Sequence, residues 1–135
     1  MKILLDANIL LDVFQNRQPH YYASVRCLDK ILRSEMEGVI PAHVVTTFYY
    51  VMNKFLGKEV ARDAIGWLLD NFTIAACDDG ILSNAHASKM SDFEDAVVAM
   101  SAERDGCSFI VTRNLDDFDN SPVTAISPAH FLELL

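Results

Sequence analysis

The chain has 135 residues, of which 19 are acidic and 11 basic, and its formal net charge is −8. This length fits a single domain that can bury a core without disulfides or a structural metal. The negative charge argues against a protein that binds nucleic acid by general electrostatic attraction. It leaves open a metal-dependent enzyme that acts on phosphates, because a bound cation reverses the local charge.

Short apolar runs alternate along the chain with longer amphipathic segments, and no linker or repeat interrupts them. Runs that are apolar on both faces are typical of strands in a parallel sheet covered by helices, and they span 3–5, 39–40, 72–76, 109–111 and 123–126. Helical spacing of apolar residues predicts helices within 19–36, 44–55, 60–72 and 93–104, and after Pro128. We therefore expect one domain, residues 1–135, of class α/β: three layers, α/β/α, with a central parallel five-stranded sheet.

No run approaches the roughly 18 apolar residues of a membrane span, and residues 3–5 are too short for the apolar part of a signal peptide. We therefore expect a cytoplasmic protein that does not contact a membrane. Three cysteines without CxxC spacing predict buried, reduced thiols.

Acidic residues follow or precede the predicted strands at the same end of the sheet. Asp6 ends the first strand, Asp95 lies at the start of a helix, and Asp117 follows the fourth strand. Ligands of doubly wound sheets bind beyond the carboxyl ends of the strands. Two carboxylates 4 Å apart repel by about 4 kcal/mol at an effective dielectric constant near 20. Protons or a metal must relieve this repulsion, and a site made only of oxygens suits Mg²⁺ or Mn²⁺.

Each polar residue at this edge also has a simple structural interpretation. Asp12 can be a solvated helical residue, and Asp92 an N-cap or a first-turn acid. The run 116–119 can be a turn. Glu94 is expected to point away from Asp95 as a solvated acid. His43, near the edge after the second strand, can contact RNA or cap a helix.

Three segments together resemble the signatures of the PIN-domain nucleases, in the same order and with similar separations. They are LLDANILLD at 4–12, DFEDAV at 92–97 and IVTRNLDDF at 110–118. Many members of that family are the toxin half of a bacterial toxin–antitoxin pair. The resemblance implies a PIN fold and an endoribonuclease that depends on Mg²⁺ or Mn²⁺ and cleaves single-stranded RNA to 5′-phosphate and 3′-hydroxyl ends. It also implies a homodimer and a cognate antitoxin protein as partners.

The resemblance also assigns roles to individual residues. Catalysis and metal binding fall to Asp6, Asp95 and Asp117, with Asp92 as a further ligand. Supporting roles fall to Asn8, Thr47, Thr112 and Asn114. Arg113, beside the acids, is the expected contact to a substrate phosphate. Which of four acids bind the metal stays open: Asp92, Asp95, Asp116 and Asp117.

One position departs from the family pattern. Many members carry a glutamate early in the helix after the second strand, where this chain has Thr46 and Thr47. Thr47 lies three residues after Val44 and four before Val51, which predicts that it faces inward. A hydroxyl is a weak ligand for Mg²⁺, so a catalytically weak or inactive PIN-like module that binds RNA or protein is the first alternative.

The second alternative is a response-regulator receiver, which is also a small doubly wound domain with acids at the strand ends. It would need a phosphoacceptor Asp at the end of the third strand and a Lys at the end of the last. The segment 77–79 is only a partial match, and no Lys follows Ile126.

Overall fold

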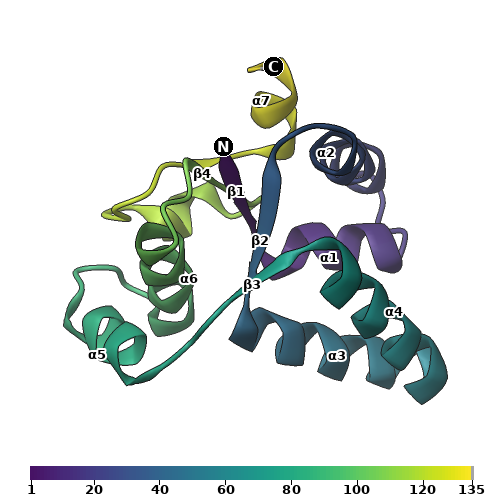
Figure 1. The fold of residues 1–135 in the computed structure, drawn as a ribbon, viewed down its shortest axis with the longest axis horizontal. Helices are drawn as coiled ribbons and strands as arrows, with labels where there is room; N and C mark the ends of the chain where they lie inside the picture. The colour runs from purple at the N-terminus through teal and green to yellow at the C-terminus, as the bar shows by residue number, and fades with distance from the viewer. Residues whose placement is uncertain (135) are drawn as a thin grey trace.

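Five parallel strands form the centre of the molecule in the computed structural model, which describes residues 1–134 (Figure 1). They are β1 (Lys2–Leu5), β2 (Glu37–Pro41), β3 (Thr73–Ala75), β4 (Phe109–Val111) and β5 (Ala125–Ile126). Their spatial order is β3-β2-β1-β4-β5, and every neighbouring pair is parallel. The predicted five-stranded parallel sheet is confirmed. Receiver domains have the order 2-1-3-4-5, so the receiver alternative is wrong.

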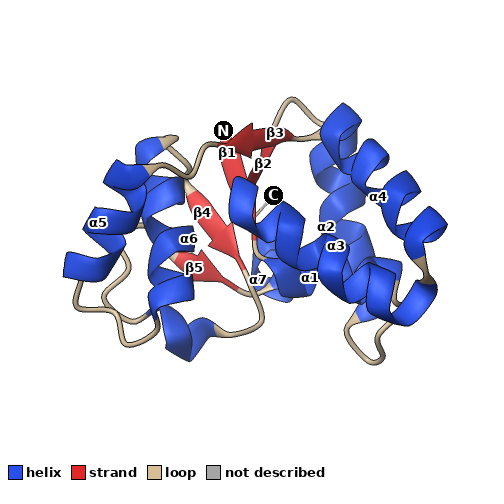
Figure 2. Ribbon diagram, turned by 90° about the horizontal axis from the view of Figure 1, so that it is seen from below, coloured by secondary structure: helices blue, strands red, loops and turns tan. Residues whose placement is uncertain are grey.

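Helices cover both faces of the sheet, as the predicted three-layer architecture requires (Figure 2). One layer holds α1 (Ala7–Phe14), α2 (Tyr21–Arg33), α3 (Ala42–Leu56) and α4 (Lys58–Asn71). The other holds α5 (Asp79–Ala87) and α6 (Phe93–Arg104). The short α7 (Pro128–Glu133) packs against α2. The helix α5 is not predicted from the sequence.

The core lies on both sides of β1, whose Ile3, Leu4 and Leu5 are completely buried. Helix α6 is buried over most of its surface, because the sheet lies on one side of it and α5 on the other. This explains its run of small apolar residues at 96–99. Cys27 and Cys107 are buried free thiols, as predicted, whereas Cys77 is half-buried. Within residues 1–134 no helix combines the length and apolar character that crossing a bilayer requires.

The chain reverses its direction of winding between β1 and β4, the neighbouring central strands. It moves outward from β1 through β2 to β3, then returns to the other side of β1 to form β4 and β5. Asp6 follows β1 and Thr112 follows β4, so both lie at this switch point. Ligand sites of open α/β sheets occur at such points.

Candidate active site

Asp6 lies at the carboxyl end of β1 and is also the N-cap of α1. Its Oδ1 accepts a hydrogen bond from the Ala7 N–H (2.8 Å), and its Oδ2 accepts one from the Thr112 hydroxyl (2.9 Å). The side chain is 5% exposed. Burial raises the pKa of Asp6 above its usual range, the two hydrogen bonds act in the opposite direction, and the charge of Glu94 adds to the rise. The carboxylate is therefore fixed in position and costly to ionise.

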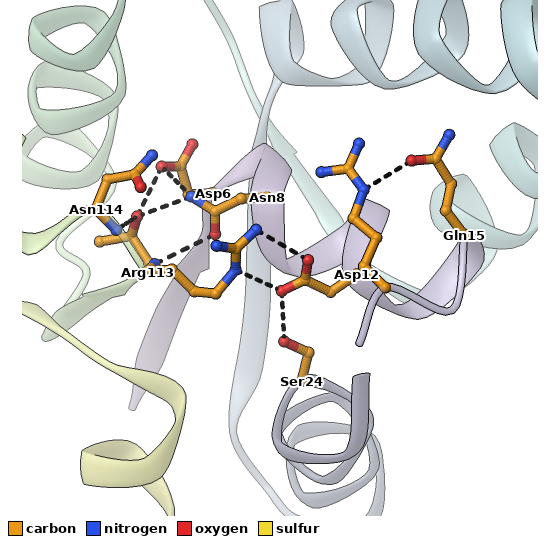
Figure 3. A network of polar contacts seen from close by, with 9 residues as sticks. Asp6, Asn8, Asp12, Gln15, Ser24, Arg113 and Asn114 are labelled. Atoms are coloured by element: carbon orange, nitrogen blue, oxygen red, sulfur yellow. Dashed lines mark hydrogen bonds and ion pairs between the residues drawn. The ribbon is translucent and has the colours of Figure 1, made fainter. Parts of the chain in front are cut away.

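Beside Asp6 lies a set of residues linked by hydrogen bonds, which we name the paired network: Asn8, Asp12, Ser24, Thr112 and Arg113. Figure 3 shows Asn8, Asp12, Ser24 and Arg113 of this network next to Asp6. The Asn8 amide donates to Thr112 Oγ1 (3.1 Å) and to Asp6 Oδ2 (3.4 Å). Its carbonyl accepts from the Arg113 backbone N–H (3.3 Å). The network thereby joins α1 to the segment after β4. Thr112 and Asn8 thus both contact the Asp6 carboxylate directly.

Asp12 and Arg113 form a two-point ion pair within this network (Figure 3). Arg113 Nε donates to Asp12 Oδ2 (2.7 Å) and Nη2 donates to Oδ1 (3.0 Å), while the Ser24 hydroxyl also donates to Oδ2 (3.1 Å). Asp12 is completely buried, so its interpretation as a solvated residue is wrong. Because two donor nitrogens of Arg113 are engaged, its predicted contact with a substrate phosphate depends on its remaining N–H groups and stays a prediction.

Across Asp6 from the paired network lies the first turn of α6, with three acids. Asp92 is the N-cap and accepts from the Asp95 N–H (2.9 Å). Asp92, Glu94 and Asp95 each place a carboxylate oxygen within 4.8 Å of the others. The expectation that Glu94 points away is therefore wrong, although its side chain is exposed, as expected. Because Asp92 has extended backbone angles (φ −110°, ψ 127°), a helical wheel does not describe the relation between these residues.

The charges of four other acids act on the Asp95 carboxyl group. Burial raises its pKa to about 7, and the charges of Asp92, Asp6, Glu94 and Asp117 add to the rise. We name these five residues the acid cluster. Within residues 1–134, no Lys or Arg forms an ion pair with any of them. A concentration of oxygen ligands without protein cations fits a hard divalent metal ion.

Asp117 reaches the cluster from the 3₁₀ helix η1 (Leu115–Phe118), which follows β4. Buried Phe118 anchors this turn, while Asp117 is exposed and its N–H donates to the Asn114 carbonyl (3.1 Å). Asn114 is exposed, and its N–H donates to Thr112 Oγ1 (3.1 Å). Residues 113–117 line an open pocket. Of the run 116–119, which the sequence predicts as a turn, residues 116–118 belong to the 3₁₀ helix and Asp119 begins the turn that follows it.

The residue of helix α3 that lies near the acids is His43, whereas the sequence predicts Thr47. Thr47 is exposed, and its hydroxyl donates to the His43 carbonyl of its own helix (3.2 Å). The prediction that Thr47 faces inward is wrong, because Val51, on which the prediction depended, is itself only half-buried. His43, one turn earlier on the same face of α3, places Nε2 3.7 Å from Glu94 Oε1. His43 therefore reaches the acids from α3.

Comparisons with known proteins match nearly the whole chain. Ribonuclease VapC1 of Aquifex aeolicus (strain VF5) is 24% identical over 136 residues, which cover 98% of this chain and 94% of that protein. VapBC2 of Rickettsia felis bound to promoter DNA superposes with a TM-score of 0.73 at 16% identity, covering 94% of this chain and 98% of the other. A toxin–antitoxin complex from Klebsiella pneumoniae gives 0.71 at 22% identity, covering 93% and 97%.

The fold of these structures is thus the fold of this chain. The profile of the PIN domain matches residues 2–116, which include Asp6, the first turn of α6 and the end of β4. The chain belongs to the PIN domain family.

Proposed function

We propose that the protein is an endoribonuclease that uses Mg²⁺ or Mn²⁺ and is the toxin of a toxin–antitoxin pair. The observation that carries this proposal is the acid cluster at the switch point of the sheet, where Asp95 has a pKa raised to about 7 and five acids lack a Lys or Arg partner among residues 1–134. The ribonuclease from A. aeolicus and the toxin–antitoxin complex from K. pneumoniae support it.

Asp6, Asp95 and Asp117 hold the metal in this proposal, with Asp92 as a further ligand. When bound, Mg²⁺ or Mn²⁺ supplies an activated water and stabilises the charge that develops on the phosphodiester. Thr112 and Asn8 fix the orientation of the Asp6 carboxylate through their hydrogen bonds. The Asp95 backbone N–H donates to the Asp92 carboxylate, which holds these two acids together at the start of α6. The RNA is left with 5′-phosphate and 3′-hydroxyl ends.

A partner surface is also part of the proposal. Large apolar side chains are exposed on α3 and α4: Tyr50, Phe55, Leu56, Val60 and Leu69. Such a surface supports contact with another protein, either a second copy of this chain in a homodimer or an antitoxin. Sedimentation velocity of the purified chain distinguishes a dimer from a monomer that requires a different protein.

The proposal is tested by incubating a mixed pool of single-stranded RNA with the protein and Mg²⁺ or Mn²⁺. We expect cleavage by the natural protein and a loss of at least about 100-fold for Asp6→Asn, because the carboxylate that ends β1 is lost. Asp63→Asn, an exposed acid on α4, is the matched control and should cleave normally. Equal rates for the natural protein and Asp6→Asn would contradict the proposal.

A second function, a module that binds RNA without cleaving it, is favoured by one observation. The family glutamate of α3 is missing, and Thr47 at its place is exposed. This function predicts that RNA is bound and recovered intact in the presence of Mn²⁺. Cleavage that Asp6→Asn abolishes would exclude it.

A further inference from the structure

His43 lies in the first turn of α3 and faces the acid cluster. Its Nε2 is 3.7 Å from Glu94 Oε1. Only 21% of the side chain is exposed, compared with 49% for Glu94. The imidazole is therefore more buried than the Glu94 carboxylate. It lies at the sheet edge where Asp6 follows β1 and β2 leads into α3.

The ring nitrogens of His43 lack partners. Both Nδ1 and Nε2 are buried, and neither forms a hydrogen bond with any residue of 1–134. The distance to Glu94 is too long for a hydrogen bond. Burying an unpaired polar atom is unfavourable, and buried polar groups in proteins nearly always have a partner. An unpaired imidazole beside a group of acids therefore indicates a site for a ligand that binds both.

The spacing of the two groups fits one divalent metal ion. Metal–nitrogen and metal–oxygen distances of about 2.0–2.2 Å place two neighbouring ligand atoms about 3–4 Å apart. The 3.7 Å between His43 Nε2 and Glu94 Oε1 lies in this range. Glu94 also belongs to the group of Asp92, Glu94 and Asp95, whose carboxylate oxygens lie within 4.8 Å of one another.

We propose that His43 is a metal ligand through Nε2, and that with Glu94 it replaces the carboxylate missing from α3. The inference rests on the proposed metal-dependent function of the same site. Imidazole is a better ligand for transition metals than for Mg²⁺, whereas carboxylates suit both Mg²⁺ and Mn²⁺. The site therefore prefers Mn²⁺ to Mg²⁺. His43 thus determines the choice of metal, a property that the acids alone do not supply.

Titration calorimetry of Mn²⁺ and of Mg²⁺ into the full chain tests this inference without measuring cleavage. We expect Mn²⁺ to bind at least about tenfold more tightly than Mg²⁺ to the natural protein. His43→Ala should weaken Mn²⁺ binding about 10- to 100-fold, the range that loss of a group supporting a metal site produces, and change Mg²⁺ binding much less. His86→Ala, which removes an exposed histidine of α5, is the matched control and should bind both metals normally.

A spectroscopic measurement separates coordination from an indirect effect on folding. Electron spin echo modulation of the Mn²⁺ complex should show a coupled ¹⁴N nucleus in the natural protein and in His86→Ala, and no such coupling in His43→Ala or in the polar variant His43→Asn. Circular dichroism checks that each variant is folded.

The outcomes distinguish this inference from the proposed function. Mn²⁺ binding with no ¹⁴N coupling, or with unchanged affinity in folded His43→Ala, would overturn the role of His43 and leave the metal-dependent function intact. Failure of the natural protein to bind either metal would overturn both.

Discussion

The two sides of Asp6 differ in how their polar groups are satisfied. In the paired network, the charge of buried Asp12 is matched by the Arg113 guanidinium and by the Ser24 hydroxyl. In the acid cluster, five carboxylates gather without a Lys or Arg partner among residues 1–134, and the neighbouring His43 has two unpaired nitrogens. The paired network is complete within the chain, whereas the acid cluster requires a ligand.

At this sheet edge, the paired network stabilises the fold and the acid cluster is available for function. The paired network joins α1, α2 and the segment after β4, so it fixes the backbone from which Asp6 and Asp117 extend. The acid cluster instead keeps like charges close together, which opposes folding until a cation binds. Substitutions on the two sides should therefore have opposite effects on the stability of the metal-free protein.

The largest effect is expected from Arg113→Ala. It leaves the Asp12 carboxylate buried without its cation, which costs about 3–5 kcal/mol of unfolding free energy. Urea denaturation measures this cost. Arg33→Ala, which removes an exposed i,i+4 pair with Asp29, is the control and should cost less than about 0.5 kcal/mol. Similar losses for the two variants would show that the paired network is not a distinct stabilising region.

A smaller loss is expected from Thr112→Val, which keeps the shape of the buried side chain and removes its hydroxyl. Asp6 Oδ2 loses a donor, and the N–H groups of Asn8 and Asn114 lose an acceptor. We expect a cost of about 1–3 kcal/mol in chemical denaturation and a weakening of Mn²⁺ binding by about 10- to 100-fold. Thr46→Val, at an exposed position on α3, should leave Mn²⁺ binding unchanged. Unaltered Mn²⁺ binding by Thr112→Val would show that the paired network does not support the metal site.

The smallest effect is a dependence of stability on pH that belongs to the acid cluster. Asp95 has a folded pKa of about 7, above the value of about 3.9 for an unfolded chain. Between these values the folded state holds a proton that the unfolded state releases, so this contribution to stability is present at low pH and is lost as the pH rises through 7. The size is about 1 kcal/mol, because solvent screens a half-exposed group.

Comparing Asp95→Asn with the natural protein between pH 5 and pH 8, without metal, isolates this contribution. The natural protein should lose stability relative to the variant as the pH rises, and Asp63→Asn should follow the natural protein. Parallel pH profiles for Asp95→Asn and the natural protein would mean that the carboxylates do not repel one another.

The sheet and its acids could be predicted because local pattern determines them. Runs such as 3–5 and 109–111 are buried on both faces in any parallel sheet, and an acid that ends such a run must lie at its carboxyl edge. Other features depend on contacts between distant residues. The burial of Asp12 depends on Arg113, 101 residues away, and nothing in the local sequence distinguishes it from a solvated helical acid.

Helical periodicity predicts the direction of two side chains of the site wrongly. Glu94 joins Asp92 and Asp95 because Asp92 is a cap with extended angles. Thr47 is exposed because it lies beside the buried stripe that contains Val44 and Phe48, not within it. His43, on the same face one turn earlier, was visible in the sequence, but its approach to Glu94 depends on how α3 and α6 meet across the sheet edge.

The most direct test of the account is thermal unfolding of the natural protein and of Asp95→Asn at pH 8, each with and without saturating Mn²⁺. Without metal, we expect Asp95→Asn to melt about 3 °C higher, because one repelling charge is removed. With Mn²⁺ at about 100 times its dissociation constant, the natural protein should gain about 2.7 kcal/mol and become the more stable of the two. If Mn²⁺ stabilises neither protein, or stabilises both equally, the acid cluster is not a metal site.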